Sequence, residues 1–232
     1  MDSGKVIVIE GVCDCIGKTT QIKLLEEKFK NASIEYVTHH FPTKGKPQAE
    51  YAEKYLKGAF GQRNKLDPFL INSFFTIDRA VTWKQDLKEK YDTGNIILLD
   101  RYTTSSLTYQ GALIDDKDER DKFLEYVQNH EYNVLRIQKP DLVIFLKAPY
   151  EVVKMFEQKR DLITNKKKDI HESDDEYMKK VYNLSSIIAE KYGWSIIDYM
   201  DNGRIKTEEE INEEIINILE EKLHLNLSKT LK

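Results

Sequence analysis

The feature that most constrains this chain is a short glycine- and lysine-containing loop between an apolar run and a segment of helical periodicity. Residues 6–9 form a continuous β-branched run, which predicts a buried parallel strand. Gly11 follows this run, and Gly17-Lys18-Thr19-Thr20 opens the segment of helical periodicity. A glycine loop between a strand and a helix is the setting of a Walker A loop, whose main-chain N–H groups bind phosphate. We therefore predict a nucleotide-binding site at the start of the first helix.

Each residue type in this loop has a physical role in binding a triphosphate. Gly17 lets the backbone approach the phosphates, Lys18 neutralises the β- and γ-phosphates, and the Thr19 hydroxyl is a ligand for Mg²⁺. The predicted ATP-binding residues are Gly11, Cys15, Ile16, Gly17, Lys18, Thr19 and Thr20. The loop has one residue more than the standard spacing, so either it bulges before Asp14 or Val12 takes the place of the first glycine. The competing interpretation is a strand–turn–helix corner with a solvated lysine.

Composition argues against several other classes of protein. The net charge of −4 gives no overall positive field, so we expect neither a nucleic-acid nor a membrane partner. The only cysteines, Cys13 and Cys15, cannot form a disulfide framework, and no second pair completes a metal site. No apolar stretch reaches the length of about 18 residues that a membrane span needs. We expect a cytoplasmic protein, in which Cys15 is either an oxidisable thiol near a helix N-terminus or inert.

Short apolar runs alternate with helical segments along the rest of the chain. Further strands are predicted at residues 34–37, 96–99, 142–146 and 194–197, and helices at 48–56, 68–92, 103–112, 117–136 and 174–192, after Pro149 and after the N-cap residue Thr207. This alternation predicts a single α/β domain over residues 1–232, in which helices cover both faces of a five-stranded parallel sheet. Ligands of such sheets bind beyond the carboxyl ends of the strands.

Two segments carry side chains suited to a second phosphate and a base. Asp100 and Arg101 follow the strand at 96–99; the carboxylate can hold Mg²⁺ or orient an acceptor, and the guanidinium can bind a phosphate bidentately. Phe75 and Arg79 are four positions apart in the helix at 68–92, so they share a face and can form a nucleobase clamp. The alternatives are a structural ion pair at the strand end and an aromatic core residue of the helix.

The order of these motifs resembles that of the thymidylate kinase family, over roughly residues 4–220. The motifs are Glu10-Gly11, Asp14-x-x-Gly17-Lys18-Thr19-Thr20-Gln21, Phe41-Pro42, Phe75-x-x-x-Arg79, Asp100-Arg101-Tyr102-x-x-Ser105, Tyr109-Gln110-Gly111 and Lys139-Pro140-Asp141-Leu142. The resemblance implies a P-loop NTPase fold of the nucleoside monophosphate kinase type, with ATP and dTMP as substrates, Mg²⁺ as cofactor, and a homodimer formed through the helices at 68–92 and 103–112.

The resemblance also implies a role for each matching position. It assigns the acceptor pocket to Asp14, Phe41, Pro42, Phe75, Arg79, Arg101, Ser105, Ser106, Tyr109 and Gln110. In this assignment Asp14 faces the sugar, Phe75 stacks on thymine, Ser105 or Ser106 reads the base edge, and Tyr109 disfavours a 2′-hydroxyl. Thr19 and Asp100 are the expected metal-site residues. Many members have an arginine shortly after Phe-Pro; here Lys44 or Lys46 is the candidate replacement.

A charged segment at 160–175 resembles the short mobile lid of these kinases and is predicted to interrupt the helix after Pro149. Phosphoryl transfer needs positive charge around the transferred group, and the loop at 11–20 contains no arginine. We predict that Arg160, or one of Lys166, Lys167 and Lys168, contacts phosphate when the lid closes. With Lys18, Arg101 and Asp14, Arg160 completes the predicted catalytic set. His171 and Glu172 either contact the acceptor or begin the next helix.

These residues predict transfer of the γ-phosphate of ATP to dTMP, which yields ADP and dTDP. The acceptor phosphate is already ionised, so alignment and charge compensation suffice. A deoxynucleoside kinase would need a carboxylate base near the end of the second strand, where residues 38–41 contain no Asp or Glu. A non-catalytic nucleotide-binding protein would not need a second phosphate site. The sequence does not distinguish dTMP from dUMP.

Overall fold

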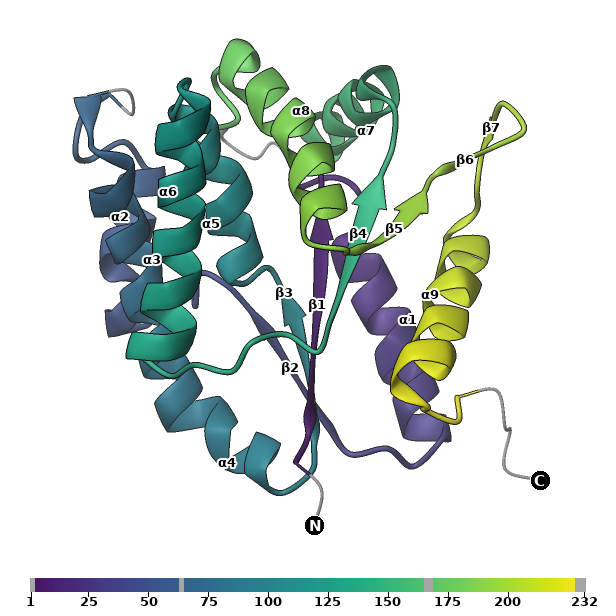
Figure 1. The fold of residues 1–232 in the computed structure, drawn as a ribbon. Coiled ribbons are helices and arrows are strands. Elements are labelled where there is room, and N and C mark those ends of the chain that lie inside the picture. The colour runs from purple at the N-terminus through teal and green to yellow at the C-terminus, as the bar shows by residue number, and fades with distance from the viewer. Residues whose placement is uncertain (1–2, 63–64, 165–168, 228–232) are drawn as a thin grey trace.

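A five-stranded parallel sheet forms the centre of the computed structural model, which describes residues 3–62, 65–164 and 169–227 (Figure 1). The strands are β1 (Lys5–Gly11), β2 (Tyr36–His40), β3 (Ile96–Asp100), β4 (Leu142–Lys147) and β5 (Ser195–Asp198). Their order across the sheet is β2-β3-β1-β4-β5, and every neighbouring pair is parallel. The predicted sheet is therefore confirmed, with the glycine loop following its central strand.

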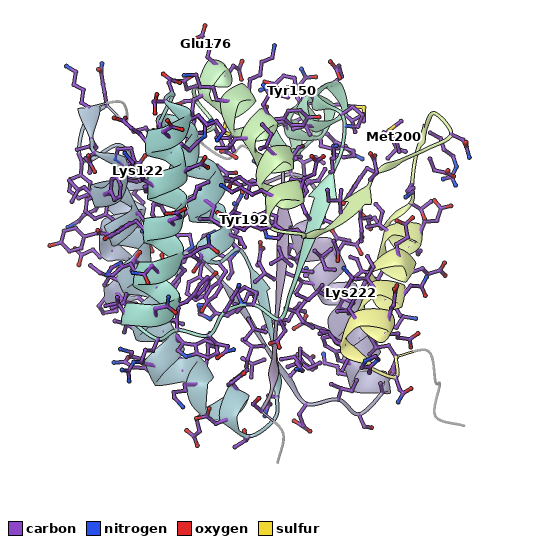
Figure 2. All side chains as sticks on the ribbon, viewed as in Figure 1. Lys122, Tyr150, Glu176, Tyr192, Met200 and Lys222 are labelled. Carbon is purple, nitrogen blue, oxygen red and sulfur yellow. The ribbon has the colours of Figure 1, made fainter. Side chains whose placement is uncertain are left out.

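Helices cover both faces of the sheet (Figure 1). On one side are α1 (Lys18–Asn31) and α9 (Glu208–Leu223); on the other are α3 (Pro68–Thr82), α5 (Thr103–Tyr109), α6 (Lys117–Gln128) and α8 (Asp175–Lys191). The outer helices are α2 (Glu50–Leu56) and α4 (Lys88–Asp92), and α7 (Tyr150–Thr164) follows β4. Tyr150 and Glu176, in α7 and α8, lie at the end of the molecule toward which the strands point (Figure 2). Within the described residues, every helix is too short or too polar to cross a bilayer.

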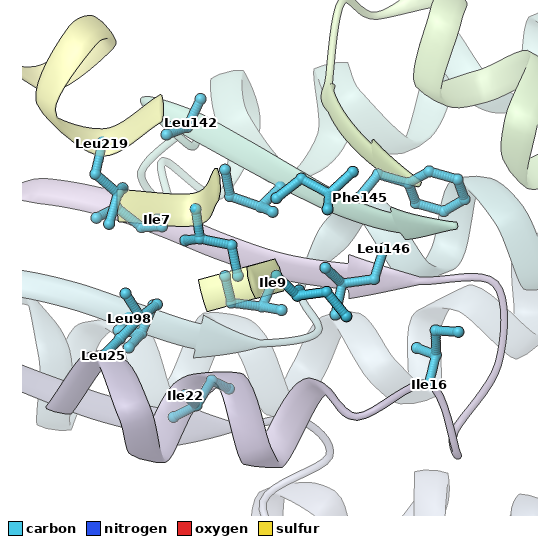
Figure 3. Packing of buried hydrophobic residues seen from close by; sticks show 14 of the residues in the cluster. Ile7, Ile9, Ile16, Ile22, Leu25, Leu98, Leu142, Phe145, Leu146 and Leu219 are labelled. Atoms are coloured by element: carbon cyan, nitrogen blue, oxygen red, sulfur yellow. The ribbon is translucent and has the colours of Figure 1, made fainter. Parts of the chain in front are cut away.

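The alternation of side chains along β1 explains why its apolar run is unbroken. Ile7 and Ile9 pack with Leu25 of α1 and Leu219 of α9 (Figure 3). Val6 and Val8 point the other way and pack in a second cluster with Trp83 and Leu87. Because successive residues of a strand face opposite sides, a strand buried on both faces must be apolar at every position. This burial fixes the register of β1 and thus the point at which the glycine loop begins.

Several helix boundaries follow the predicted capping signals. Asp67 caps α3 by accepting hydrogen bonds from the N–H groups of residues 69 and 70, and Pro68 occupies the first turn. Thr207 and Glu210 form a reciprocal capping box at the start of α9. Both arrangements satisfy backbone donors that would otherwise lack partners at a helix start.

Several predicted boundaries are wrong: the helix predicted at 103–112 ends at Tyr109, and two others have a clear cause. The second strand begins at Tyr36 rather than at residue 34, because Ser33 adopts a φ of 53° and the Ile34 N–H donates to the Phe29 carbonyl, which closes α1. The helix after Pro149 is not interrupted at Arg160 but continues to Thr164. Arg and Leu are good helix formers, and a charged run on an exposed helix costs little, so charge alone did not mark the end.

Several irregular elements were not predicted. The helix at 68–92 contains a π-helical turn at Trp83–Leu87, and the helix at 117–136 ends in another at Asn129–Val134. A small hairpin of β6 (Met200–Asp201) and β7 (Arg204–Ile205) follows β5. Its turn residues Asn202 and Gly203 have φ values of 48° and 82°, and an Asn-Gly pair is a recognised signal for such a turn.

Candidate functional site

A cavity of about 990 Å³ lies beyond the carboxyl ends of the central strands. It is lined by most of the residues predicted for the site: Asp14, Cys15, Lys18, Thr19, Phe41, Pro42, Phe75, Arg79, Asp100, Arg101, Ser105, Ser106, Tyr109, Gln110 and Arg160. A smaller hollow of about 310 Å³ at the start of α1 includes Gly17 and Thr20. Gly11 and Ile16 line neither cavity and are buried. The structure thus brings together segments that are far apart in the sequence.

Gly11 and Gly17 are required for the path of the loop itself. A Cβ atom on Gly11 would lie 2.4 Å from Cγ2 of Ile16, which is fully buried. Gly17 has a φ of 78°, and a Cβ there would lie 2.9 Å from the Tyr199 hydroxyl. Because Gly11 has no room for a Cβ, the first glycine position belongs to Gly11 and not to Val12. Of the two alternatives, this favours the bulge before Asp14.

Lys18 lies folded over the loop that precedes it. Its side chain is only 3% exposed, its Nζ donates to the Cys13 carbonyl at 3.0 Å, and the same atom is 3.8 Å from Oδ1 of Asp14. The partners of the ammonium are thus a carbonyl and a carboxylate of its own loop. A phosphate bound at the start of α1 would meet this charge together with the free N–H groups of the first helical turn.

Arg101 is held by side chains from three different elements. Its guanidinium contacts Asp14 of the loop, Ser105 at 3.1 Å and the Tyr109 hydroxyl at 3.1 Å. A fourth partner is Glu10, at 3.4 Å, whose fully buried carboxylate also accepts from the hydroxyls of residues 104 and 105 and from the N–H of residue 11. Sequence reasoning missed Glu10 as a site residue. A carboxylate directly after a buried β-branched run was the available signal.

Arg79 lies in the interior but reaches the cavity wall. It is 2% exposed and pairs with Glu131 through both Nε (2.7 Å) and Nη2 (2.6 Å), while Nη2 also donates to Ser106 at 2.9 Å. The Ser106 hydroxyl, a candidate for reading the base edge, thus accepts from this arginine; that of Ser105 bonds to Glu10 at 2.6 Å. Sequence reasoning missed Glu131, and no local pattern marks it.

Phe75 faces the same cavity and contacts Tyr55 edge-on, with 6.0 Å between the ring centroids. Phe41 and Pro42 are joined by a cis peptide bond at the end of β2. Lys44 also lines the cavity, whereas Lys46 does not. Of the two lysines considered as replacements for the arginine of the resembled family, only Lys44 therefore lies at this wall.

The residues expected to hold Mg²⁺ suit a hard cation. Asp100 is almost completely buried; its Oδ2 lies 3.1 Å from Nδ1 of His40, and its Oδ1 has no hydrogen-bond partner among the described residues. Burial opposes ionisation, but the His40 hydrogen bond and the charges of Lys18 and Arg101 outweigh it and lower the pKa of Asp100. An ionised carboxylate oxygen without a partner, on the same cavity wall as the Thr19 hydroxyl, fits the oxygen ligation of Mg²⁺.

In the predicted lid segment, Arg160, His171 and Glu172 line the cavity. Arg160 pairs with Glu172 and, at 2.7 Å, with Asp161. His171 and Glu172 are buried and line the cavity; α8 begins later, at Asp175 with Asp174 as its cap, so neither starts that helix. Lys166, Lys167 and Lys168 lie outside the described residues.

Comparisons with known proteins all find the same family. A family model described as thymidylate kinase matches residues 9–211. Among curated relatives, a "Thymidylate kinase" of Brachyspira hyodysenteriae is 30% identical over 220 residues, and the match covers 94% of each chain. A "Thymidylate kinase" of Prochlorococcus marinus is 29% identical over 203 residues, which are 86% of this chain and 90% of the relative. A "Thymidylate kinase" of Desulfotalea psychrophila is 30% identical over 148 residues, so this chain spans 65% of that relative.

The fold itself has a match among solved structures. A structure of thymidylate kinase from Candida albicans superposes with a TM-score of 0.71 at 23% identity, and the match covers 97% of this chain and 96% of the other. At this identity the likeness speaks for the fold alone, and the family model carries the assignment because it matches most of the chain. The chain belongs to the thymidylate kinase family.

Proposed function

We propose that the protein is an ATP-dependent phosphotransferase that converts dTMP to dTDP with Mg²⁺ as cofactor. The observation that carries this proposal is the meeting of two cations at one carboxylate. Asp14 contacts Arg101 and lies 3.8 Å from Nζ of Lys18, so the lysine of the glycine loop and an arginine from the end of β3 face the same cavity. Two such cations, one on each side, suit a donor phosphate and an acceptor phosphate aligned for transfer.

In this mechanism the chain aligns its substrates and compensates their charge. Lys18 would exchange the Cys13 carbonyl for phosphate oxygens of ATP, and Arg101 would bind the acceptor phosphate. Thr19 and Asp100 would hold Mg²⁺, which when bound neutralises charge on the phosphate oxygens. Closure of the segment that contains Arg160 would exclude water and limit ATP hydrolysis.

The cavity is better suited to an anionic acceptor than to a hydroxyl. A nucleoside kinase needs a carboxylate that can take a proton from the 5′-hydroxyl. The two carboxylates whose charges interact with Lys18 are Asp14, which contacts Arg101, and Asp100, which contacts His40. Carboxylates engaged in this way are poor bases, because their partners favour the ionised form.

Coupled measurement of ADP release tests the proposal, with dTMP, thymidine or no acceptor present. The expected result is release that depends on dTMP. Release that depends on thymidine would indicate a deoxynucleoside kinase, and equal slow release in all three reactions would indicate a nucleotide-binding protein with little turnover.

A homodimer is part of the same proposal. The family resemblance implies an interface through α3 and α5, and α3 exposes Leu70 and Ile77, each 47% accessible. Exposed apolar side chains on one helix are consistent with a covered surface in solution. Sedimentation equilibrium should therefore report twice the mass of the chain, and a monomer at micromolar concentration would count against this part.

A further inference from the structure

Glu131 is the central residue of a buried hydrogen-bond network beneath the part of the cavity wall that Arg79 and Ser106 form, the acceptor side in the proposed function. It lies in the π-helical turn Asn129–Val134 and is completely buried. Its Oε1 accepts from the Thr76 hydroxyl at 2.8 Å and from Nη2 of Arg79 at 2.6 Å. Its Oε2 accepts from the Thr103 hydroxyl at 2.7 Å and from Nε of Arg79 at 2.7 Å. Each oxygen thus binds one threonine and one arginine nitrogen, from α3 and α5.

This network fixes the orientation of the Arg79 guanidinium. Nη2 makes two further hydrogen bonds, to Ser106 at 2.9 Å and to Asn72 at 3.3 Å. Within the described part of the chain, Nη1 is the one guanidinium nitrogen that makes no hydrogen bond. Because Arg79 contributes to the cavity wall, the nitrogen that remains for a ligand is the one that the network does not use.

The hydrogen bonds around Glu131 and Arg79 indicate that this ion pair has a role besides stabilising the fold. A buried pair contributes little to stability compared with apolar side chains of the same size, so its presence here calls for another reason. The hydroxyls and the amide around Glu131 all have hydrogen-bond partners, as buried polar groups require. The donor capacity left over belongs to Nη1 of Arg79, and Arg79 lines the cavity.

We propose that Glu131 is a positioning residue for acceptor binding, which acts through Arg79 by holding its Nη1 toward the cavity. An oxygen of the nucleoside monophosphate would then meet a donor that is already oriented and needs no reorganisation on binding. The proposal rests on the proposed function, because it concerns the acceptor of that reaction. It predicts an effect on the acceptor without an equal effect on ATP.

The decisive variants remove hydrogen bonds to the Glu131 carboxylate but keep both Glu131 and Arg79. Thr76→Val and Thr103→Val each delete one hydroxyl that binds a different oxygen of Glu131, with almost no change in side-chain volume. Thr108→Val is the matched control, because its hydroxyl is equally buried in α5 but donates to the Ser105 carbonyl. For the double variant Thr76→Val/Thr103→Val we expect KM for dTMP to rise about tenfold, which corresponds to the loss of one charge-assisted hydrogen bond to the acceptor. We expect kcat to stay within about twofold of the wild-type value.

Glu131→Gln is a stronger test of the same idea. The amide keeps the shape but removes the charge, so the guanidinium is no longer held by two ionic hydrogen bonds. We expect KM for dTMP, and the dissociation constant of dTMP measured by calorimetry, to rise roughly 10²-fold, with KM for ATP within about threefold. Should this variant fail to fold, the two threonine variants decide the question.

The outcomes separate the inference from a purely structural role and from the proposed function. A lower melting temperature with dTMP affinity equal to that of Thr108→Val would assign Glu131 to stability alone and overturn the inference. Equal increases in KM for ATP and dTMP would overturn it as well. Absence of dTMP binding by the wild-type protein would overturn the proposed function and this inference together, whereas normal wild-type turnover with unaffected variants would overturn the inference alone.

Discussion

The two sides of the cavity hold their cations in different ways. On the donor side, Lys18 contacts groups of its own loop, the Cys13 carbonyl and the Asp14 carboxylate. On the acceptor side, Arg101 and Arg79 bind carboxylates 91 and 52 residues away along the chain. A lysine is a point charge on a flexible stem, whereas an arginine presents a planar fork that pairs in fixed geometry. The donor side therefore has a cation that can follow a moving phosphoryl group, and the acceptor side has cations that define where a substrate must lie.

This difference suits the direction of the proposed reaction. The γ-phosphoryl group travels from one side to the other, so the charge that accompanies it gains from freedom of movement. The acceptor must instead be held in line, where a misplacement of about 1 Å can cost roughly 10²-fold in rate. Four sets of variants test this difference between the two sides.

Removal of the lid cations should have the largest effect. Alanine at Arg160 together with residues 166–168 should lower kcat at least about 10³-fold, because the transferred group would lose positive charge that the glycine loop does not supply. The matched control replaces four exposed cations outside both cavities by alanine: Lys88, Lys90, Lys122 and Arg204. Stopped-flow or coupled assays measure kcat; an unchanged value in the lid variant would show that the cavity needs no further cation.

Lys18→Ala should lower kcat/KM roughly 10²–10³-fold, the range for removal of one positioned group that stabilises transition-state charge. The loop itself should survive, because its glycines and the buried Ile16 set its path. Lys23→Ala on the exposed side of α1 is the control. The comparison would be weakened if Lys18→Ala changed KM for dTMP more than KM for ATP in the same coupled assay.

Arg101→Lys should lower kcat/KM for dTMP about 10²-fold although it keeps the charge, because an ammonium cannot reproduce a fork that meets Asp14, Ser105 and Tyr109 together. Arg204→Lys, in an exposed ion pair with Glu210, is the control and should have near-wild-type activity. Equal activity of Arg101→Lys and wild type would show that charge alone matters on the acceptor side.

The same difference explains how much the sequence could predict. The donor side is built from consecutive residues and backbone N–H groups, so the loop at 11–20 could be identified from its motif and its place between strand and helix. The acceptor side depends on partners brought together by folding. Arg79 and Arg101 could be proposed from their motifs, but Glu131 could not, because nothing near residue 131 in the sequence indicates that it would lie under α3. Its position further depends on a π-helical turn, which periodicity cannot predict.

The sheet and its helices were predicted more completely than the residues at which each strand or helix begins and ends. Burial on both faces of β1 and β3 imposes an apolar pattern, and this pattern is visible in the sequence. The start of β2 depends instead on how the chain leaves α1, through the positive φ of Ser33. A backbone choice of this kind at a serine leaves no compositional trace.

The smallest expected effect concerns the thiols of the donor loop, whose sulfur atoms are 3.4 Å apart. A hydrogen bond from Cys13 stabilises the Cys15 thiolate and lowers the pKa of Cys15, whereas that hydrogen bond and burial raise the pKa of Cys13. Cys15 is therefore more ionised than an ordinary thiol at a given pH, and its alkylation by iodoacetamide should reach half-maximal rate at a lower pH than that of an unperturbed thiol. Cys13→Ala should shift this midpoint to higher pH, as followed by mass spectrometry of the alkylated protein. Cys15→Ala should reduce the loss of activity caused by peroxide, as followed by the coupled assay. An unchanged midpoint in Cys13→Ala would mean that Cys13 does not lower the pKa of Cys15, and unchanged peroxide sensitivity in Cys15→Ala would mean that activity does not depend on this thiol.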